Sequence, residues 1–117
     1  MYQEQFQNYE SASDEVHDLR LELLSREEEL LLAKDELAYQ ESVLVLKAEG
    51  KNAEERKANF TIMAQDDEEY QGALLNLRAR SHAVALAEAE LDRGIARQRG
   101  LGWLFRAVGQ INSPSSE

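Results

Sequence analysis

The stretch AEGKNAEERKA, residues 48–58, divides the chain into two helical patterns. Gly50 follows a long run of helix-forming residues, and glycine most readily adopts the left-handed conformation that ends a helix. Asn52 is a favourable N-cap residue, and Glu55 stands where it can complete a capping box. The stretch therefore predicts a turn at residues 49–52 between two antiparallel helices, and the alternative is a kink inside one continuous helix.

Lines of apolar residues spaced seven apart flank this turn. They are Leu44, Leu37, Leu30, Leu23, Val16, Tyr9 and Tyr2 before it, and Met63, Tyr70, Leu77, Val84 and Leu91 after it. An unbroken seven-residue repeat is typical of a coiled-coil seam. With the turn centred on residue 50, the numbers of facing residues sum to about 100, which places Leu23 opposite Leu77. We therefore expect an all-α fold, a long antiparallel αα-hairpin with coiled-coil-like packing and helices at about 10–48 and 53–98.

The run AQDDEEY at residues 64–70 is the one place where the second helix could break. Asp66 and Glu69 have the spacing of a second capping box, and acidic residues favour the first turn of a helix. Met63 and Tyr70, however, keep the seven-residue phase across the run. We expect a continuous or mildly kinked helix here, with a break as the alternative.

A further apolar line runs beside the first seam, and a two-helix hairpin would leave it uncovered. Such an exposed apolar face favours association with another copy of the chain. The candidate interface residues are Leu24, Leu31, Ala38, Val45, Leu74 and Leu86. We expect a homodimer or tetramer, most simply a dimer that completes a four-helix bundle; the alternative is that the C-terminal segment folds back over this face.

Composition sets limits on location and chemistry. The 117 residues carry a net charge of −10 and contain no cysteine, which excludes disulfides and thiolate metal sites. No apolar run is long enough to span a membrane, and the N-terminus lacks the apolar region of a signal peptide. We expect a single domain over residues 1–109 in the cytoplasm, which is that of the host cell if a phage encodes the chain.

The C-terminal segment RGIARQRGLGWLFRAVGQINSPSSE, residues 93–117, differs in character from the rest. Gly100 predicts a helix stop, followed by a short segment at 101–108 and a disordered tail at 110–117. The candidate contact residues are Arg97, Arg99, Trp103, Phe105 and Arg106. We favour a structural cap in which Trp103 is buried at the open end of the bundle; the alternatives are contacts to a partner protein, to single-stranded nucleic acid through residues 93–106, or to a membrane surface.

Motifs for catalysis are lacking. The chain contains no glycine-rich phosphate loop, nucleophile elbow or thiol. Asp14 and His17 have a spacing found in carboxylate metal sites, but no equivalent pair precedes His82, and we interpret both histidines as solvated surface residues. We expect no catalytic residues, no metal and no cofactor, and a protein that is not an enzyme.

The segment Gly50–Ala58, with Asp67, Tyr70 and the Ala87-Glu88 and Glu90 positions beyond it, resembles a group of small helical proteins encoded by phages and prophages. That group carries a GKN-x-EER-x-A motif between two long helices and has no settled activity. The resemblance implies a phage context. The leading hypothesis is an acidic helical oligomer that binds, and regulates or inhibits, a protein of nucleic-acid metabolism or host defence, with carboxylates that imitate a phosphate backbone. The alternative is a single-stranded nucleic-acid-binding accessory of replication or recombination that uses the basic, aromatic C-terminal segment.

Overall fold

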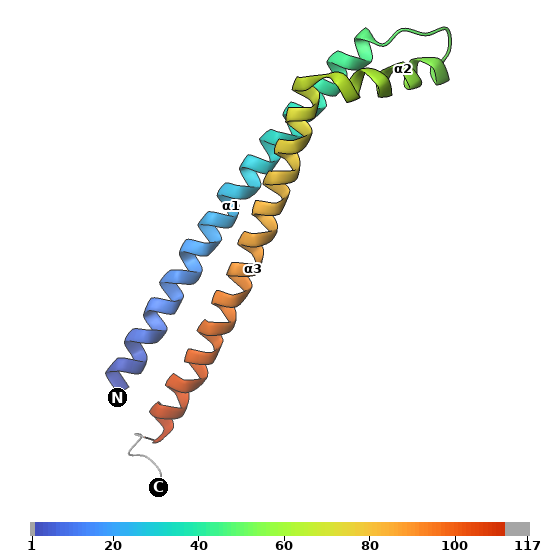
Figure 1. Cartoon of the computed structure of the whole chain (residues 1–117). Helices are drawn as coiled ribbons and strands as arrows, with labels where there is room; N and C mark the ends of the chain where they lie inside the picture. The colour runs from blue at the N-terminus through green and yellow to red at the C-terminus, as the bar shows by residue number, and fades with distance from the viewer. Residues whose placement is uncertain (1, 112–117) are drawn as a thin grey trace. The chain divides into compact units, whose positions relative to one another are not determined.

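The computed structural model describes residues 2–111, apart from the side chains of Tyr2, Phe105, Gln110 and Ile111. This range forms three α-helices and no strand: α1 is Tyr2–Lys47, α2 is Ala53–Asp66 and α3 is Glu68–Ile111 (Figure 1). The all-α prediction is confirmed. Helix α1 begins well before the expected residue 10, and residues 112–117 of the predicted tail lie outside the described range.

The turn between α1 and α2 forms where the sequence predicts it. Asn52 has extended backbone angles, φ −144° and ψ 174°, and its side-chain oxygen accepts a hydrogen bond of 2.9 Å from the backbone N–H of Glu55. Gly50 differs from the expectation, because no glycine among the described residues has a positive φ. A Cβ atom at Gly50 would lie 2.7 Å from the backbone nitrogen of Arg56. Glycine is therefore required here because the loop backbone approaches the start of α2 closely.

The expectation of a continuous second helix through residues 64–70 is wrong. Helix α2 ends at Asp66, and Asp67 has extended angles of φ −83° and ψ 114°. The Asp67 carboxylate accepts a 2.7 Å hydrogen bond from the backbone N–H of Tyr70, so it caps the first turn of α3. The Gln71 side chain donates to the Ala64 carbonyl, which α2 leaves without a helical partner near its end. Figure 1 shows the change of direction between α2 and α3.

The predicted helix stop at Gly100 is also wrong, because α3 continues to Ile111. Residues 101–108 are therefore part of α3 and not a separate segment. Glycine inside a helix costs only about 1 kcal/mol relative to alanine, so packing with another helix can offset it. The N-terminal part of α1 provides that packing. The Tyr9 ring lies 3.3 Å from the position that a Cβ of Gly102 would occupy.

The chain divides into two compact units, which we describe separately. Unit 1 combines the N-terminal part of α1, up to Ser25, with the C-terminal part of α3, from Ala85. Unit 2 comprises Arg26–Val84 and contains the turn, α2 and the remaining parts of α1 and α3. Within each unit α1 and α3 run side by side (Figure 1).

The inner sides of α1 and α3 are lined mainly by small residues. Ala12 and Val16 in unit 1 and Ala33 in unit 2 are each no more than 4% exposed. The other buried apolar residues are Leu44, Ala64, Ala73 and Ala87. Leu23, Leu30, Leu37 and Leu77 are half-buried on these inner sides, in the seam lines that the sequence indicates. Because alanine and glycine have little or no side chain, α1 and α3 can approach one another closely within each unit.

The pairing of the helices differs from the predicted register by about ten residues. The facing pairs are Glu15 with Arg97, Val16 with Gly94 and Tyr9 with Gly102 in unit 1, and Glu29 with Arg80 in unit 2. Their residue numbers sum to between 109 and 112 rather than to about 100. At this register Leu23 lies level with Ala87, not with Leu77. The predicted register placed two lines of large residues against each other, whereas the structure sets Val16 and Tyr9 of α1 against Gly94 and Gly102 of α3, which allows close packing at these points.

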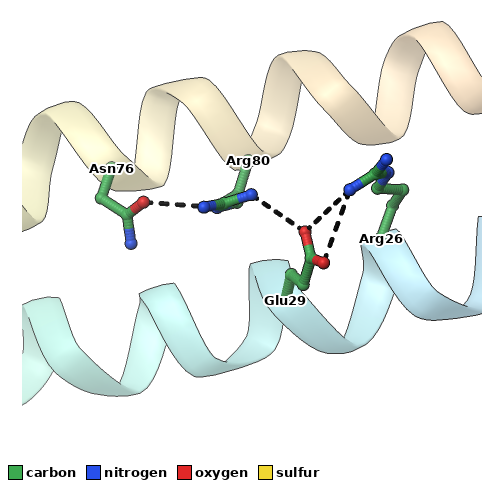
Figure 2. A network of polar contacts seen from close by, with 4 residues as sticks. All are labelled: Arg26, Glu29, Asn76 and Arg80. Carbon is green, nitrogen blue, oxygen red and sulfur yellow. Dashed lines mark hydrogen bonds and ion pairs between the residues drawn. The ribbon is translucent and has the colours of Figure 1, made fainter.

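A polar network crosses between α1 and α3 in unit 2 (Figure 2). Arg80 of α3 donates a 3.0 Å hydrogen bond to the Glu29 carboxylate of α1, and Arg26 lies 3.3 Å from the same oxygen. Arg80 also donates to the Asn76 side chain at 3.3 Å. These side chains remain more than one third exposed, so we expect the ion pairs to contribute at most about 1 kcal/mol and to act mainly on the register.

Candidate interaction surfaces

The residues predicted to form an oligomer interface are mostly exposed. Leu24, Leu31 and Val45 of α1 and Leu86 of α3 are between 51% and 60% exposed, and Ala38 is also exposed. Leu74 is half-buried. Leu31, Ala38, Val45 and Leu74 belong to unit 2, whereas Leu24 and Leu86 belong to unit 1.

Three further apolar residues of α1 extend this face in unit 2. Leu32, Tyr39 and Leu46 are 68%, 62% and 87% exposed, and each directly follows a residue of the predicted line. We name the combined set the α1 apolar surface; it consists of Leu31, Leu32, Ala38, Tyr39, Val45 and Leu46. This second line was not among the predicted interface residues, although its own seven-residue spacing is visible one position further along the chain.

Helical periodicity explains why these residues are exposed. The α1 apolar surface occupies two adjacent lines on the side of α1 opposite the inner residues Ala33, Gln40 and Leu44. At the α2 end of this surface, Val45 of α1, Ala48 of the following loop and Phe60 of α2 line a hollow of about 340 Å³. The hollow shows that apolar lining continues from α1 onto α2 within unit 2.

The charged residues around the α1 apolar surface are mainly acidic. The exposed charged residues of α1 between positions 27 and 41 are Glu27, Glu28, Asp35, Glu36 and Glu41, together with Lys34. Five carboxylates against one ammonium group give this part of α1 a strongly negative potential. A partner that covers this surface must therefore supply apolar side chains. The negative charge must be offset either by cations of the partner or by salt in solution.

The second surface lies in unit 1, where α3 carries most of the predicted tail-contact residues. A hollow of about 250 Å³, which we name the arginine–aromatic hollow, is lined by Tyr9, Gln98, Arg99, Gly102, Trp103 and Arg106. The Arg106 guanidinium carbon lies 5.8 Å from the centroid of the Trp103 ring, within the range of a cation–π interaction. Tyr9 was not among the predicted contact residues, because only the observed register brings the start of α1 beside this part of α3.

The predicted burial of Trp103 as a structural cap is wrong. Its side chain is 71% exposed, because the neighbouring Gly102, and not Trp103, faces the Tyr9 ring of α1. Arg97, another predicted contact residue, forms a 2.5 Å ion pair with Glu15 of α1. The side chain of Phe105 lies outside the described residues. Of the predicted contact set, the hollow thus brings together Arg99, Trp103 and Arg106.

The histidines do not form a recognisable centre. His17 lies in unit 1 and His82 in unit 2, and both are exposed. Among the described residues, no group of three or more histidine, aspartate or glutamate side chains is arranged to hold a metal ion. None of the helices over residues 2–111 has the length and apolar character needed to cross a membrane.

Comparison with family models, with curated proteins and with solved structures gives no match for this chain.

Proposed function

We propose that this chain is a non-enzymatic interaction protein that associates with a second copy of itself through the α1 apolar surface. The observation that carries the proposal is the exposure of Leu31, Leu32, Tyr39, Val45 and Leu46, which is between 57% and 87% for each side chain. Isolated exposed apolar residues are ordinary on protein surfaces. Six such residues that recur on one side of a helix are typical of an interface.

The energetic argument favours self-association. Complete burial of a leucine, valine or isoleucine side chain contributes about 1.5–3 kcal/mol, so two copies that cover each other's α1 apolar surface gain several such contributions. A two-fold axis uses each surface twice, once from each copy. In this proposal α1 and α3 form a long antiparallel hairpin, and a homodimer completes a four-helix bundle; the alternative assembly is a tetramer.

We further propose that the acidic exterior of this oligomer binds a protein with a basic surface. Glu27, Glu28 and Asp35 lie exposed along α1, and the chain as a whole carries a net charge of −10. Rows of carboxylates can occupy a cleft that normally binds a phosphate backbone, by electrostatic complementarity. The resemblance of residues 50–58 to phage-encoded proteins directs the choice of partner to a host protein of nucleic-acid metabolism or defence, which the oligomer would regulate or inhibit.

Sedimentation equilibrium on two matched variants tests the self-association. Leu31→Glu places a charge in the α1 apolar surface, whereas Leu75→Glu places the same charge at an equally exposed leucine of α3, 62% against 60%. We expect the unaltered chain and Leu75→Glu to sediment with at least twice the mass of one chain. Leu31→Glu should dissociate with a Kd raised by about 1,000-fold, because the leucine of each copy loses about 2 kcal/mol of burial and a dimer contains two such leucines.

Two results contradict the proposal. The first is a monomeric mass for the unaltered chain at every concentration measured. The second is a dimer that Leu75→Glu dissociates and Leu31→Glu does not, which would move the interface to α3.

A further inference from the structure

The arginine–aromatic hollow of unit 1 combines groups that the α1 apolar surface does not use. Arg99, Trp103 and Arg106 stand at positions i, i+4 and i+7 of α3, so their side chains leave the helix on one side. Seven residues of helix rise by about 10.5 Å, which separates the Cα atoms of Arg99 and Arg106 along the axis. The Arg106 guanidinium carbon lies 5.8 Å from the centroid of the Trp103 ring. Tyr9 of α1 lines the opposite wall.

We infer that this hollow binds a nucleotide unit of a single-stranded nucleic acid. Trp103, 71% exposed, offers a ring on which a base can stack, and Arg99 and Arg106 line the same hollow, where they can contact the phosphates next to that base. Gly102 lacks a side chain, which lets the Tyr9 ring of α1 pack against α3 beside Trp103. The inference goes beyond the proposed self-association, because it uses different residues in a different unit.

Local charge supports an anionic ligand despite the acidity of the whole chain. Between Ile95 and Asn112 the sequence contains Arg97, Arg99 and Arg106 and no carboxylate. Arg97 is paired with Glu15, so the positive charge that lines the hollow comes from Arg99 and Arg106. Two arginines give weak binding that salt reduces strongly, with a slope of log K against log salt of about −1.4 for two phosphates of a single strand.

The proposed ligand is single-stranded because stacking requires an accessible base face. A base within a duplex has both faces covered by its neighbours, whereas a single strand can present one face to an aromatic side chain. The hollow measures about 250 Å³, which suits a single base and its sugar rather than a longer segment. Neighbouring nucleotides would extend outside it along α3.

Fluorescence quenching tests this inference directly, because Trp103 is the only tryptophan in the chain. The full chain is titrated with an oligothymidylate of about 12 nucleotides at about 50 mM salt. We expect saturable quenching of Trp103. The variants Arg99→Gln and Arg106→Gln should each weaken binding severalfold and reduce the salt slope by about 0.7.

Matched controls separate a specific site from diffuse charge. Arg93→Gln removes an exposed arginine of α3 that does not line the hollow, and it should leave both the affinity and the salt slope unchanged. With a fluorescent label on the oligonucleotide, Trp103→Ala should weaken binding by about tenfold, as expected for loss of one stacked base. Leu31→Glu should bind the oligonucleotide like the unaltered chain, which distinguishes failure of this inference from failure of the proposed dimer.

Several outcomes would overturn the inference. They are absence of quenching at about 50 mM salt, equal binding of a duplex of the same length, and equal quenching by heparin, a polyanion without bases. An effect of Arg93→Gln as large as that of Arg99→Gln would also overturn it. Circular dichroism of each variant shows whether helix content is retained, so a loss of binding can be assigned to the hollow.

Discussion

Replacement of Gly94 by valine tests the register in which α1 and α3 pack in unit 1. Gly94 is buried on the inner side of α3, and a Cβ atom there would lie 2.7 Å from Cδ1 of Leu19 and 3.7 Å from Cγ2 of Val16. Valine adds this Cβ and two methyl groups on its far side. Leu19 would have to move, and the two helices would have to separate locally.

The expected magnitude follows from two opposing effects. Valine has a higher helix propensity than glycine, which stabilises the folded chain by about 0.4 kcal/mol. Overpacking of a close contact costs about 1–3 kcal/mol. We therefore expect Gly94→Val to lower the free energy of unfolding by about 1–2.5 kcal/mol, and Tm by roughly 5–10 °C for a chain of this size.

Gly72 provides the matched control on the same helix. A Cβ atom at Gly72 would meet no atom within 4 Å, so Gly72→Val carries the propensity gain without the overpacking cost. Thermal unfolding followed by circular dichroism should show an unchanged or slightly higher Tm for this variant. All variants are compared at one protein concentration, because self-association makes Tm depend on concentration.

A double-mutant cycle identifies the neighbour that Gly94 contacts. Leu19→Ala removes the Cδ1 atom nearest to the new side chain, so it should recover part of the loss in Gly94→Val, with a coupling of about 1–2 kcal/mol. In the register expected from the sequence, Gly94 would instead lie level with Phe6, far along α1 from Leu19. Additive effects of Gly94→Val and Leu19→Ala would refute the observed register.

Three other predictions concern the second helix break, the exposed tryptophan and self-association. Asp67→Ala should lower the free energy of unfolding, measured by urea denaturation, by about 1 kcal/mol, because it removes the cap on the Tyr70 N–H. Asp66→Ala should have little effect. Equal losses in the two variants would mean that Asp67 is not the cap. Trp103→Ala should lower the free energy of unfolding by less than about 1 kcal/mol, whereas loss of a buried aromatic side chain typically costs about 3 kcal/mol. A loss near the larger value would mean that the Trp103 ring is covered. Sedimentation at rising salt should show stronger self-association, because screening weakens the repulsion between copies that each carry a net charge of −10. Binding to oligothymidylate should weaken over the same range of salt. Self-association that also weakens with salt would mean that ion pairs hold the copies together.

Several elements of the fold depend only on local chemistry and could be predicted from the order of residues. Asn52 and Glu55 located the start of α2, because an N-cap needs only a side-chain acceptor and a nearby backbone N–H. The seven-residue spacing located the inner residues of α1 and α3, because the helical period decides which side chains share a face. Leu31 and Val45 were identified as exposed for the same reason.

Which residues meet across the helices depends on packing in three dimensions. Local helix propensity is compatible with either a continuous helix or a break at residues 64–70. In the structure the helix breaks, and the hydrogen bond from the Tyr70 N–H to the Asp67 carboxylate stabilises the new helix start. With α2 separate from α3, α1 pairs with α3 about ten residues away from the register that symmetry around Gly50 predicts. That shift sets Val16 against Gly94 and brings Tyr9 to Gly102 and the arginine–aromatic hollow. Seven-residue lines match one another at several offsets, so periodicity alone cannot choose among them; the choice depends on how large and small side chains fit across the two helices, which is a property of their packing in space.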